Sequence, residues 1–95
     1  MRKPMAIKEL YETILKRKTT PTEGSYTSTL FTQGLARIAQ KVGEEGTEVV
    51  VAALSQPDER LVEEIADLTY HVLVLMAARG IEPQAIAREL EKRRK

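Results

Sequence analysis

The chain has 95 residues, of which 42% are hydrophobic and 31% charged, a balance typical of one small globular domain over residues 1–95. Its 15 Lys and Arg nearly balance its 14 Asp and Glu, so no overall charge favours nucleic acid, and no apolar run reaches the roughly 20 residues of a membrane span. With no Cys and one His, the chain would bind a metal through oxygen ligands. No apolar segment follows the basic N-terminus, so we expect no signal peptide and a cytoplasmic protein.

The first half of the chain predicts two helices separated by a polar loop. Residues 6–18 repeat apolar side chains at the i, i+3, i+4, i+7 spacing of an amphipathic helix. Residues 19–28 are rich in Thr, Ser, Pro and Gly, which compete with helical hydrogen bonding and indicate a loop. A second, long helix is expected from about Leu30 to Leu54, with Ser28 or Thr29 as its N-cap.

The second half predicts two more helices. Residues 55–59 form a turn in which Pro57 suits the first turn of a third helix, which ends near Gly80. A short fourth helix begins at Glu82-Pro83 and runs into the basic C-terminus. Although Val49–Val51 is β-branched, it lies inside the second helical pattern, and we interpret it as a fully buried helix turn. These elements indicate an all-α bundle of about four helices whose two long central helices are antiparallel.

Scarce aromatic residues and a wide apolar face predict an oligomer. With one Phe, three Tyr and no Trp, a chain of this size has limited means to bury a core alone. The stretch Leu68–Met76 is apolar over more of its helix than two long helices of one small chain can cover. We therefore expect a homodimer formed through the central helices.

Charged residues of the second helix share one face. At about 100° per residue, five of them fall within an arc of roughly 100°: Arg37, Lys41, Glu44, Glu45 and Glu48. The third helix repeats the theme, because Glu64 and Asp67 are i, i+3 neighbours and His71 follows one turn later. Acidic pairs on two antiparallel helices joined by a tight turn would converge into a cage of oxygen ligands, which suits Mg²⁺ or Mn²⁺ and phosphate chemistry.

The alternative is that these acids form a solvated surface, which is the commoner role of exposed charge. Against it, the acids border two runs that are apolar nearly all round, Val49–Leu54 and Leu68–Met76, and this favours a buried seam. Gly43 and Gly46 flank the acids of the second helix, where glycine lowers helix stability. We interpret them as allowing the close approach of another helix or of a substrate.

Three segments carry a family resemblance: Gly24-Ser25-Tyr26-Thr27, Lys41-Val42-Gly43-Glu44-Glu45 followed by Glu48, and Glu64-x-x-Asp67-Leu68-x-Tyr70-His71. They resemble the phosphoribosyl-ATP pyrophosphatase family of histidine biosynthesis, within the MazG-like all-α nucleotide pyrophosphohydrolases, over roughly residues 6–91. The acidic pairs are shared by the whole superfamily. The Ser-Tyr-Thr loop and the Asp-Leu-x-Tyr-His run point to this member of it.

The resemblance implies Mg²⁺-dependent hydrolysis of the α–β phosphoanhydride of 1-(5-phosphoribosyl)-ATP, a small nucleotide, to 1-(5-phosphoribosyl)-AMP and pyrophosphate, the second step of histidine biosynthesis. By the same resemblance, four acids would bind the metal: Glu45, Glu48, Glu64 and Asp67. Glu44 would add a further ligand or orient the attacking water. The catalytic candidates are therefore Glu44, Glu45 and Glu48.

Five further residues are substrate-binding candidates: Ser25, Tyr26, Thr27, Arg37 and Lys41. The first three resemble the family's substrate loop, whereas the two cations lie on the acidic arc and are placed to meet phosphate oxygens. Each group has a structural alternative, since the loop residues suit turns and caps and the cations suit ion pairs with neighbouring acids. We expect His71 to support the site through a bond to a carboxylate or a carbonyl.

Two other functions stay open. Another pyrophosphohydrolase of the superfamily would use the same carboxylates on a different nucleoside triphosphate, and the Ser-Tyr-Thr loop is the feature that separates it from the first interpretation. A non-catalytic helical dimerisation module would keep the bundle without the chemistry. Clustered acids argue against the module, because a protein without catalysis has little reason to bring them together.

Overall fold

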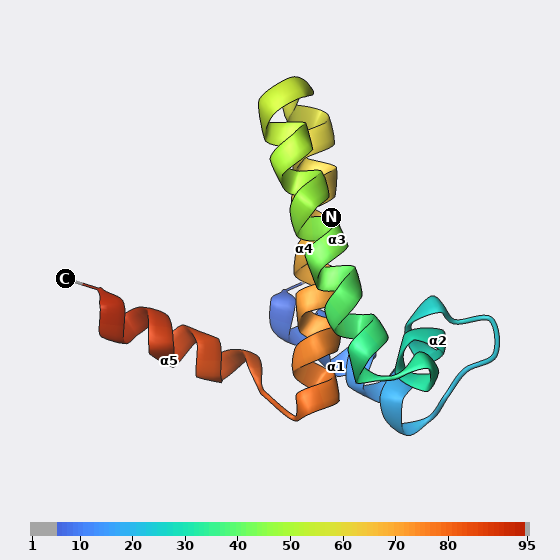
Figure 1. The fold of residues 1–95 in the computed structure, drawn as a ribbon. Coiled ribbons are helices and arrows are strands. Elements are labelled where there is room, and N and C mark those ends of the chain that lie inside the picture. Colours follow the sequence, from blue (N-terminus) through green and yellow to red (C-terminus); the bar gives the residue numbers. More distant parts are fainter. Residues whose placement is uncertain (1–5, 95) are drawn as a thin grey trace, which may run out of the picture.

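The computed structural model describes residues 6–94, and the five elements in that range are all helices. They are α1 (Ile7–Thr19), α2 (Tyr26–Gln33), α3 (Leu35–Ser55), α4 (Asp58–Arg79) and α5 (Pro83–Arg93). Figure 1 shows α3 and α4 as one long antiparallel hairpin, with α1 and α2 beside its lower half and α5 projecting away from it. The predicted all-α fold with a central antiparallel pair is confirmed. Within residues 6–94, no helix combines the length and the apolar composition that a membrane crossing requires.

The predicted helix over 30–54 is wrong in its first fifth, because the structure divides that region into α2 and α3. Gly34 separates them with a φ of 98°, a left-handed backbone conformation that residues with a side chain rarely adopt. Its N–H donates to the carbonyl of Leu30, and its own carbonyl accepts from the N–H of Ile38, both at 3.1 Å. One glycine therefore closes one helix and opens the next, and the described range holds five helices instead of about four.

The start of α2 also differs from the prediction. Its N-cap is Ser25, whose Oγ accepts from the N–H of Ser28 at 3.2 Å, so neither Ser28 nor Thr29 is the cap. Ser28 instead faces the interior at 6% exposure, where its Oγ accepts from the N–H of Thr22 and donates to the carbonyl of Arg17. A buried serine that bonds to the preceding loop thus holds α2 against the end of α1.

The other helix boundaries agree with the sequence pattern to within a residue or two. Pro57 is the N-cap of α4 rather than part of its first turn. At the other end of α4, Gly80 adopts a left-handed conformation with a φ of 71°, and its N–H donates to the carbonyl of Ala77. Pro83 then opens α5, because its missing N–H costs nothing in a first helical turn.

The core lies where α1, α2 and the lower part of the hairpin meet. Its largest fully buried side chains come from four different helices: Ile14, Leu30, Ile38 and Val74. The far end of the hairpin has no such cover, since Val50, Val51 and Leu54 are 56%, 44% and 83% exposed. The segment Val49–Val51 is helical as expected, but the prediction that it is fully buried is wrong for a single chain.

Candidate active site

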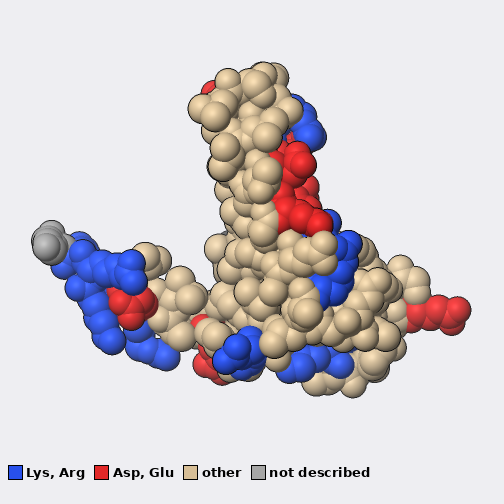
Figure 2. Space-filling view, in the orientation of Figure 1, with Lys and Arg blue, Asp and Glu red and all other residues tan. Residues whose placement is uncertain are grey.

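Three of the predicted metal ligands meet between α3 and α4. One carboxylate oxygen from each of Glu45, Glu64 and Asp67 lies within 4.8 Å of the other two. The hairpin brings them together, because Glu45 lies near the middle of α3 while the other two lie about one turn apart on the antiparallel α4. Figure 2 shows the acidic residues gathered along one side of the hairpin and bordered by basic residues. We refer to these three residues as the acidic group.

Glu64 is the buried member of the acidic group. Its side chain is 8% exposed, and Arg60 donates from Nη2 to its Oε1 at 2.6 Å. Arg60 also pairs with the exposed Glu63, and the bond to Glu63, followed by the charges of Glu63 and Glu64, raises the pKa of the guanidinium. Sequence reasoning misses Arg60, although its i, i+4 spacing to Glu64 is a usable signal for such a pair. Arg60 offsets part of the negative charge of the acidic group.

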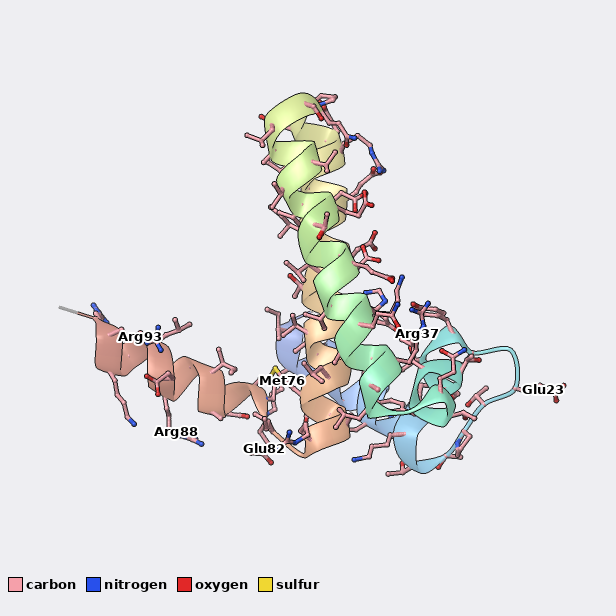
Figure 3. The ribbon with its side chains drawn as sticks, viewed as in Figure 1. Glu23, Arg37, Met76, Glu82, Arg88 and Arg93 are labelled. Atoms are coloured by element: carbon pink, nitrogen blue, oxygen red, sulfur yellow. The ribbon has the colours of Figure 1, made fainter. Side chains whose placement is uncertain are left out.

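Lys41 supplies positive charge on the α3 side. Its Nζ lies 3.2 Å from Oε1 of Glu45 and 3.6 Å from Oε1 of Glu44, and Nη1 of Arg37 lies 3.6 Å from Oε2 of Glu44. The hydrogen bond to Glu45 is the main cause that raises the pKa of Lys41; burial opposes it, and the nearby phenol of Tyr26 adds to it. Figure 3 shows Arg37 on the side of α3 that faces α2. Lys41 is therefore engaged in the i, i+3 and i, i+4 ion pairs that its spacing predicts, whereas Arg37 pairs with an acid seven positions later.

Two predicted acids lie outside the acidic group. Glu44 is exposed and accepts a hydrogen bond from Nε2 of Gln40 at 3.0 Å, in addition to its ion pairs with Arg37 and Lys41. Glu48 is exposed on the next turn of α3 and does not belong to the acidic group. To join a metal bound by the acidic group, the flexible side chain of Glu48 has to turn towards it.

The loop candidates have three different environments. Ser25 caps α2, and Thr27 is 7% exposed with its Oγ1 against the hydroxyl of Tyr70. Ser25 therefore has the capping role that was the alternative to substrate binding, whereas Thr27 makes a contact between helices that was not expected. Tyr26 differs, because its side chain is 51% exposed and its hydroxyl is held 2.9 Å from Nε2 of His71. Among these three residues, Tyr26 offers the most open surface to a ligand.

His71 supports the arrangement from the interior. It is 6% exposed, and its Nδ1 lies 2.7 Å from the backbone carbonyl oxygen of Asp67, one turn earlier on α4. The expected bond to a carbonyl is therefore present. The bond to Tyr26 was not expected, since it joins residues 45 positions apart and no local pattern signals it.

Gly43 and Gly46 do not bring another part of the chain close to α3. A Cβ built on either glycine would meet no atom within 4 Å. Within the single chain, the expectation of a close helix approach at these positions is not met. Both glycines belong to α3, the helix that also carries Glu44, Glu45 and Glu48, and the space beside them is open.

Comparison with known proteins identifies the family. The sequence model of the family described as phosphoribosyl-ATP pyrophosphohydrolase matches residues 7–94. The chain belongs to this family. A relative from Lactiplantibacillus plantarum, named phosphoribosyl-ATP pyrophosphatase, is 56% identical over 92% of this chain and 82% of its own length. Relatives of the same name from Clostridium botulinum (strain Kyoto / Type A2) and Sulfolobus acidocaldarius are 50% and 51% identical, over 99% and 94% of this chain and 86% and 94% of their own lengths.

Membership of the phosphoribosyl-ATP pyrophosphohydrolase family confirms the resemblance carried by the three sequence segments. It also makes the chain an enzyme, a hydrolase, so the interpretation as a non-catalytic dimerisation module is set aside. The acidic group lies in the part of the chain that the family model covers.

Proposed function

We propose that this chain hydrolyses the α–β phosphoanhydride of 1-(5-phosphoribosyl)-ATP to 1-(5-phosphoribosyl)-AMP and pyrophosphate, the second step of histidine biosynthesis, with the help of Mg²⁺. The observation that carries the proposal is the convergence of Glu45, Glu64 and Asp67 beside Lys41 in a member of this family. Carboxylates repel a polyphosphate, so the two approach each other only with a cation between them. An acidic group bordered by basic residues therefore supports metal-dependent chemistry on a phosphoanhydride.

The donor atoms of the acidic group suit Mg²⁺, with Mn²⁺ as the alternative metal. All three are carboxylate oxygens, the ligand type that both ions prefer. Because each Mg–O bond is about 2.1 Å long, ligands on opposite sides of the ion lie about 4.2 Å apart. Adjacent ligands lie only about 3.0 Å apart. The three oxygens, which lie within 4.8 Å of one another, would therefore draw closer together to bind the ion. We assign Glu45, Glu64 and Asp67 as ligands, with Glu48 as the fourth.

When bound, the metal would neutralise phosphate charge and lower the pKa of a bound water. The chain's own residues would orient the water and bind the phosphates. We assign Glu44, beside Glu45 on the exposed face of α3, to orient the attacking water in line with the scissile bond or to add a ligand. Arg37 and Lys41 would exchange their pairs with Glu44 for phosphate oxygens. Such exchange costs little, because the side chains of Arg37 and Glu44 are 40% and 47% exposed and exposed ion pairs contribute little stability.

We assign the substrate's base or ribose to the start of α2. The 51% exposed ring of Tyr26 supports this assignment, since an aromatic face offers a flat apolar surface for a base. Ser25 and Thr27 flank it, and their hydroxyls would exchange their present contacts, with the N–H of Ser28 and with Tyr70, for the ribose or a phosphate. These three residues are the feature expected to separate the phosphoribosyl substrate from a plain nucleoside triphosphate.

The decisive assay measures pyrophosphate release with Mg²⁺ from phosphoribosyl-ATP, ATP and dUTP in parallel, with each product identified by its mass. Release from phosphoribosyl-ATP alone is the expected result. Preference for ATP or dUTP would retain the acidic group as a metal site and replace the substrate with another triphosphate. No release from any of the three would contradict the proposed chemistry.

We further propose that the enzyme is a homodimer formed through the central helices. The apolar surface at the far end of the hairpin supports this, because Leu54 and Val62 are 83% and 65% exposed in the single chain. Figure 2 shows this end of the hairpin with few charged residues on the side away from the acids. A second copy can cover this surface, since in a twofold dimer a patch that contacts a groove on the partner is matched by the reciprocal contact.

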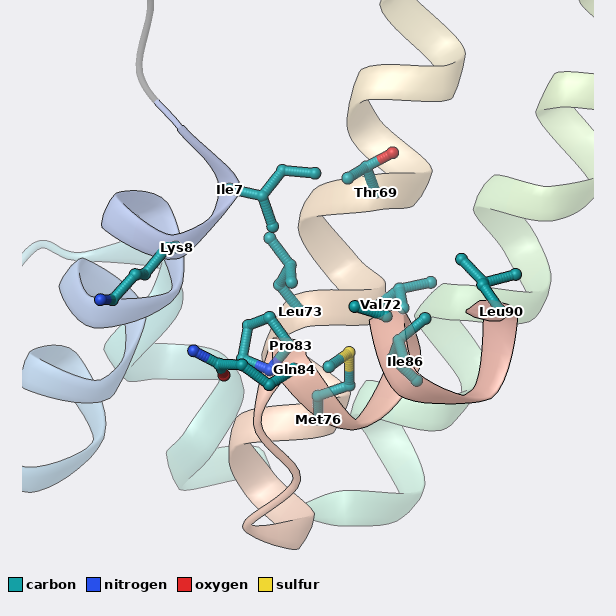
Figure 4. A pocket seen from close by; sticks show the side chains of 11 residues that line it. Ile7, Lys8, Thr69, Val72, Leu73, Met76, Pro83, Gln84, Ile86 and Leu90 are labelled. Carbon is teal, nitrogen blue, oxygen red and sulfur yellow. The ribbon is translucent and has the colours of Figure 1, made fainter. Parts of the chain in front are cut away.

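A groove between α4 and α5 gives the second copy a place to bind. It has a volume of about 480 Å³ and an almost wholly apolar lining. Figure 4 shows Val72 and Met76 of α4 and Ile86 and Leu90 of α5 around the same space. No residue of α5 is buried, so the helix has no packing partner in its own chain that covers its apolar side. The hairpin of a second copy, apolar at its end, would fill this groove.

The mass in solution tests the dimer. Light scattering across a hundredfold dilution is expected to give twice the 10.7 kDa chain mass at the higher concentrations. A monomer mass throughout the series would contradict the proposed assembly.

A further inference from the structure

His71 is the only histidine of the chain, and each of its ring nitrogens has one partner. Nδ1 lies 2.7 Å from the backbone carbonyl oxygen of Asp67, which can only accept a hydrogen bond, so Nδ1 carries a proton. In the neutral ring Nε2 is then an acceptor, and the hydroxyl of Tyr26 at 2.9 Å donates to it. The two bonds together determine the tautomer of the ring and the direction of the Tyr26 hydroxyl.

The packing of the rings restricts the same residues. The His71 ring stands edge-to-face with the rings of Tyr26 and Tyr70, at centroid distances of 5.8 Å and 5.3 Å. The hydroxyl of Tyr70 in turn contacts Oγ1 of Thr27. The first two residues of α2 therefore each contact one of two consecutive residues of α4, Tyr26 with His71 and Thr27 with Tyr70. His71 itself is 6% exposed and so has little freedom to move.

Tyr26 is unusual in being held at one end and open along the rest of its ring. Its side chain is 51% exposed, although its hydroxyl is bonded to a buried group. An exposed tyrosine without such a bond samples several rotamers, and ordering it on ligand binding costs free energy. A ring that is already held presents its surface to a ligand without that cost.

We propose that His71 is a positioning residue, which holds the hydroxyl of Tyr26 so that the exposed ring presents a fixed surface to the base or ribose of the nucleotide beside the acidic group. This inference rests on the proposed function for the identity of the nucleotide. His71 acts through Tyr26 and touches neither the reacting phosphates nor the attacking water. Its contribution belongs to substrate binding and appears in KM rather than in kcat.

Five variants separate positioning from a purely structural role. Tyr26→Phe and His71→Leu each remove the hydrogen bond between the two side chains. The double variant loses the same single bond and no other between them. His71→Gln keeps an acceptor near the position of Nε2 and is the conservative rescue. Tyr11→Phe is the matched control, because it also loses a tyrosine hydrogen bond, from its hydroxyl to the carbonyl of Ile81, at the other end of α1 from the α2 loop.

We expect Tyr26→Phe and His71→Leu each to raise KM about fivefold, the value of one ordinary hydrogen bond, with kcat changed less than about twofold. The double variant is expected to show no more than the same fivefold rise, because both changes break one interaction. His71→Gln is expected to stay near the wild-type KM, and Tyr11→Phe to leave KM unchanged. A double variant with about a 25-fold rise would overturn the proposal, as would an unchanged KM in Tyr26→Phe. Tyr26→Phe alters an exposed side chain and tests the idea even if His71→Leu does not fold.

Nitrogen NMR of the single histidine gives a readout that needs no substrate. The proposal requires the neutral ring of the wild-type chain to carry its proton on Nδ1, and a proton on Nε2 would contradict it. If the wild-type chain cleaves only ATP or dUTP, the proposed substrate is wrong, and the same KM comparison with that nucleotide still decides the role of His71. If it cleaves no nucleotide, the proposed function fails, and with it the part of this inference that concerns substrate, whereas the NMR result still decides the bond to Tyr26.

Discussion

Replacing Glu64 with Gln separates binding of a metal from support of the fold. The amide keeps the shape of the side chain and still accepts a hydrogen bond from Arg60, but it removes one charge from the acidic group. Glu63→Gln is the matched control, because Glu63 also pairs with Arg60, is 62% exposed and lies outside the acidic group. Both variants weaken an ion pair with Arg60, at a buried side chain in Glu64→Gln and at an exposed one in Glu63→Gln, and they differ in what they do to Glu45 and Asp67.

The sign of the effect on stability reverses with Mg²⁺. Unit charges separated by the 4.8 Å of the acidic group repel by about 0.9 kcal/mol in water and by about 3.5 kcal/mol at an effective dielectric constant near 20. Asp67 is exposed and Glu45 is paired with Lys41, so the lower value is nearer the effect. Without metal, Glu64→Gln is therefore expected to be about 1 kcal/mol more stable than Glu63→Gln, or about 4–8 °C in Tm.

Thermal melting at one protein concentration, with and without MgCl₂, measures both halves of this prediction. At a hundred times its Kd, Mg²⁺ stabilises the protein that binds it by about 2.7 kcal/mol, so the wild type and Glu63→Gln should gain about 10 °C or more. Glu64→Gln should lose most of that gain, together with pyrophosphate release. An equal Mg²⁺ gain in both variants, or a metal-free Glu64→Gln that melts below Glu63→Gln, would refute the assignment of Glu64 as a ligand.

Four other substitutions test the assembly and the fold. Leu54→Glu should yield a monomer by light scattering, because burying a leucine that is 83% exposed contributes about 2 kcal/mol per copy and a carboxylate opposes burial; an unchanged dimer would place the interface elsewhere. Tyr11→Phe should lower the free energy of unfolding by about 1 kcal/mol, since it loses the bond to the carbonyl of Ile81. Burial raises the pKa of Tyr11 in the folded state, so the wild type should lose stability as the pH rises above the ordinary pKa of 10.0. Urea melts at alkaline pH should show a smaller loss of unfolding free energy in Tyr11→Phe than in the wild type. Gly34→Ala should destabilise by about 1 kcal/mol or more because of its left-handed φ, whereas Gly43→Ala should stabilise by up to about 1 kcal/mol in a helix with open space; a Gly43→Ala protein that melts lower would show that a partner needs that space.

The break between α2 and α3 shows where periodicity stops being informative. Apolar residues continue on both sides of Gly34, so the pattern is that of one long helix. The structure has two helices instead of one. Leu30 and Ile38, on either side of the glycine, are both 1% exposed and belong to the same core. In one straight helix both residues would share one helix axis, whereas the left-handed Gly34 lets α2 and α3 have different directions.

Burial of the hairpin was equally hard to predict from the sequence. Val50 and Leu54 belong to an apolar run, and an apolar run indicates that something covers it without indicating what. In the single chain, α1 and α2 reach only the lower half of the hairpin, so these side chains stay exposed.

By itself, the sequence determined the all-helical fold, the turn between α3 and α4, the family, and the acids that lie on one face of each helix. Those features are local, because the helical period decides which neighbours three or four residues apart share a side. Only the tertiary structure decided that Glu45 meets Glu64 and Asp67 while Glu48 stays outside, and that His71 bonds to Tyr26 across 45 positions. Contacts between helices depend on where each helix begins and how its side chains pack against the next, and spacing along the chain does not contain that information.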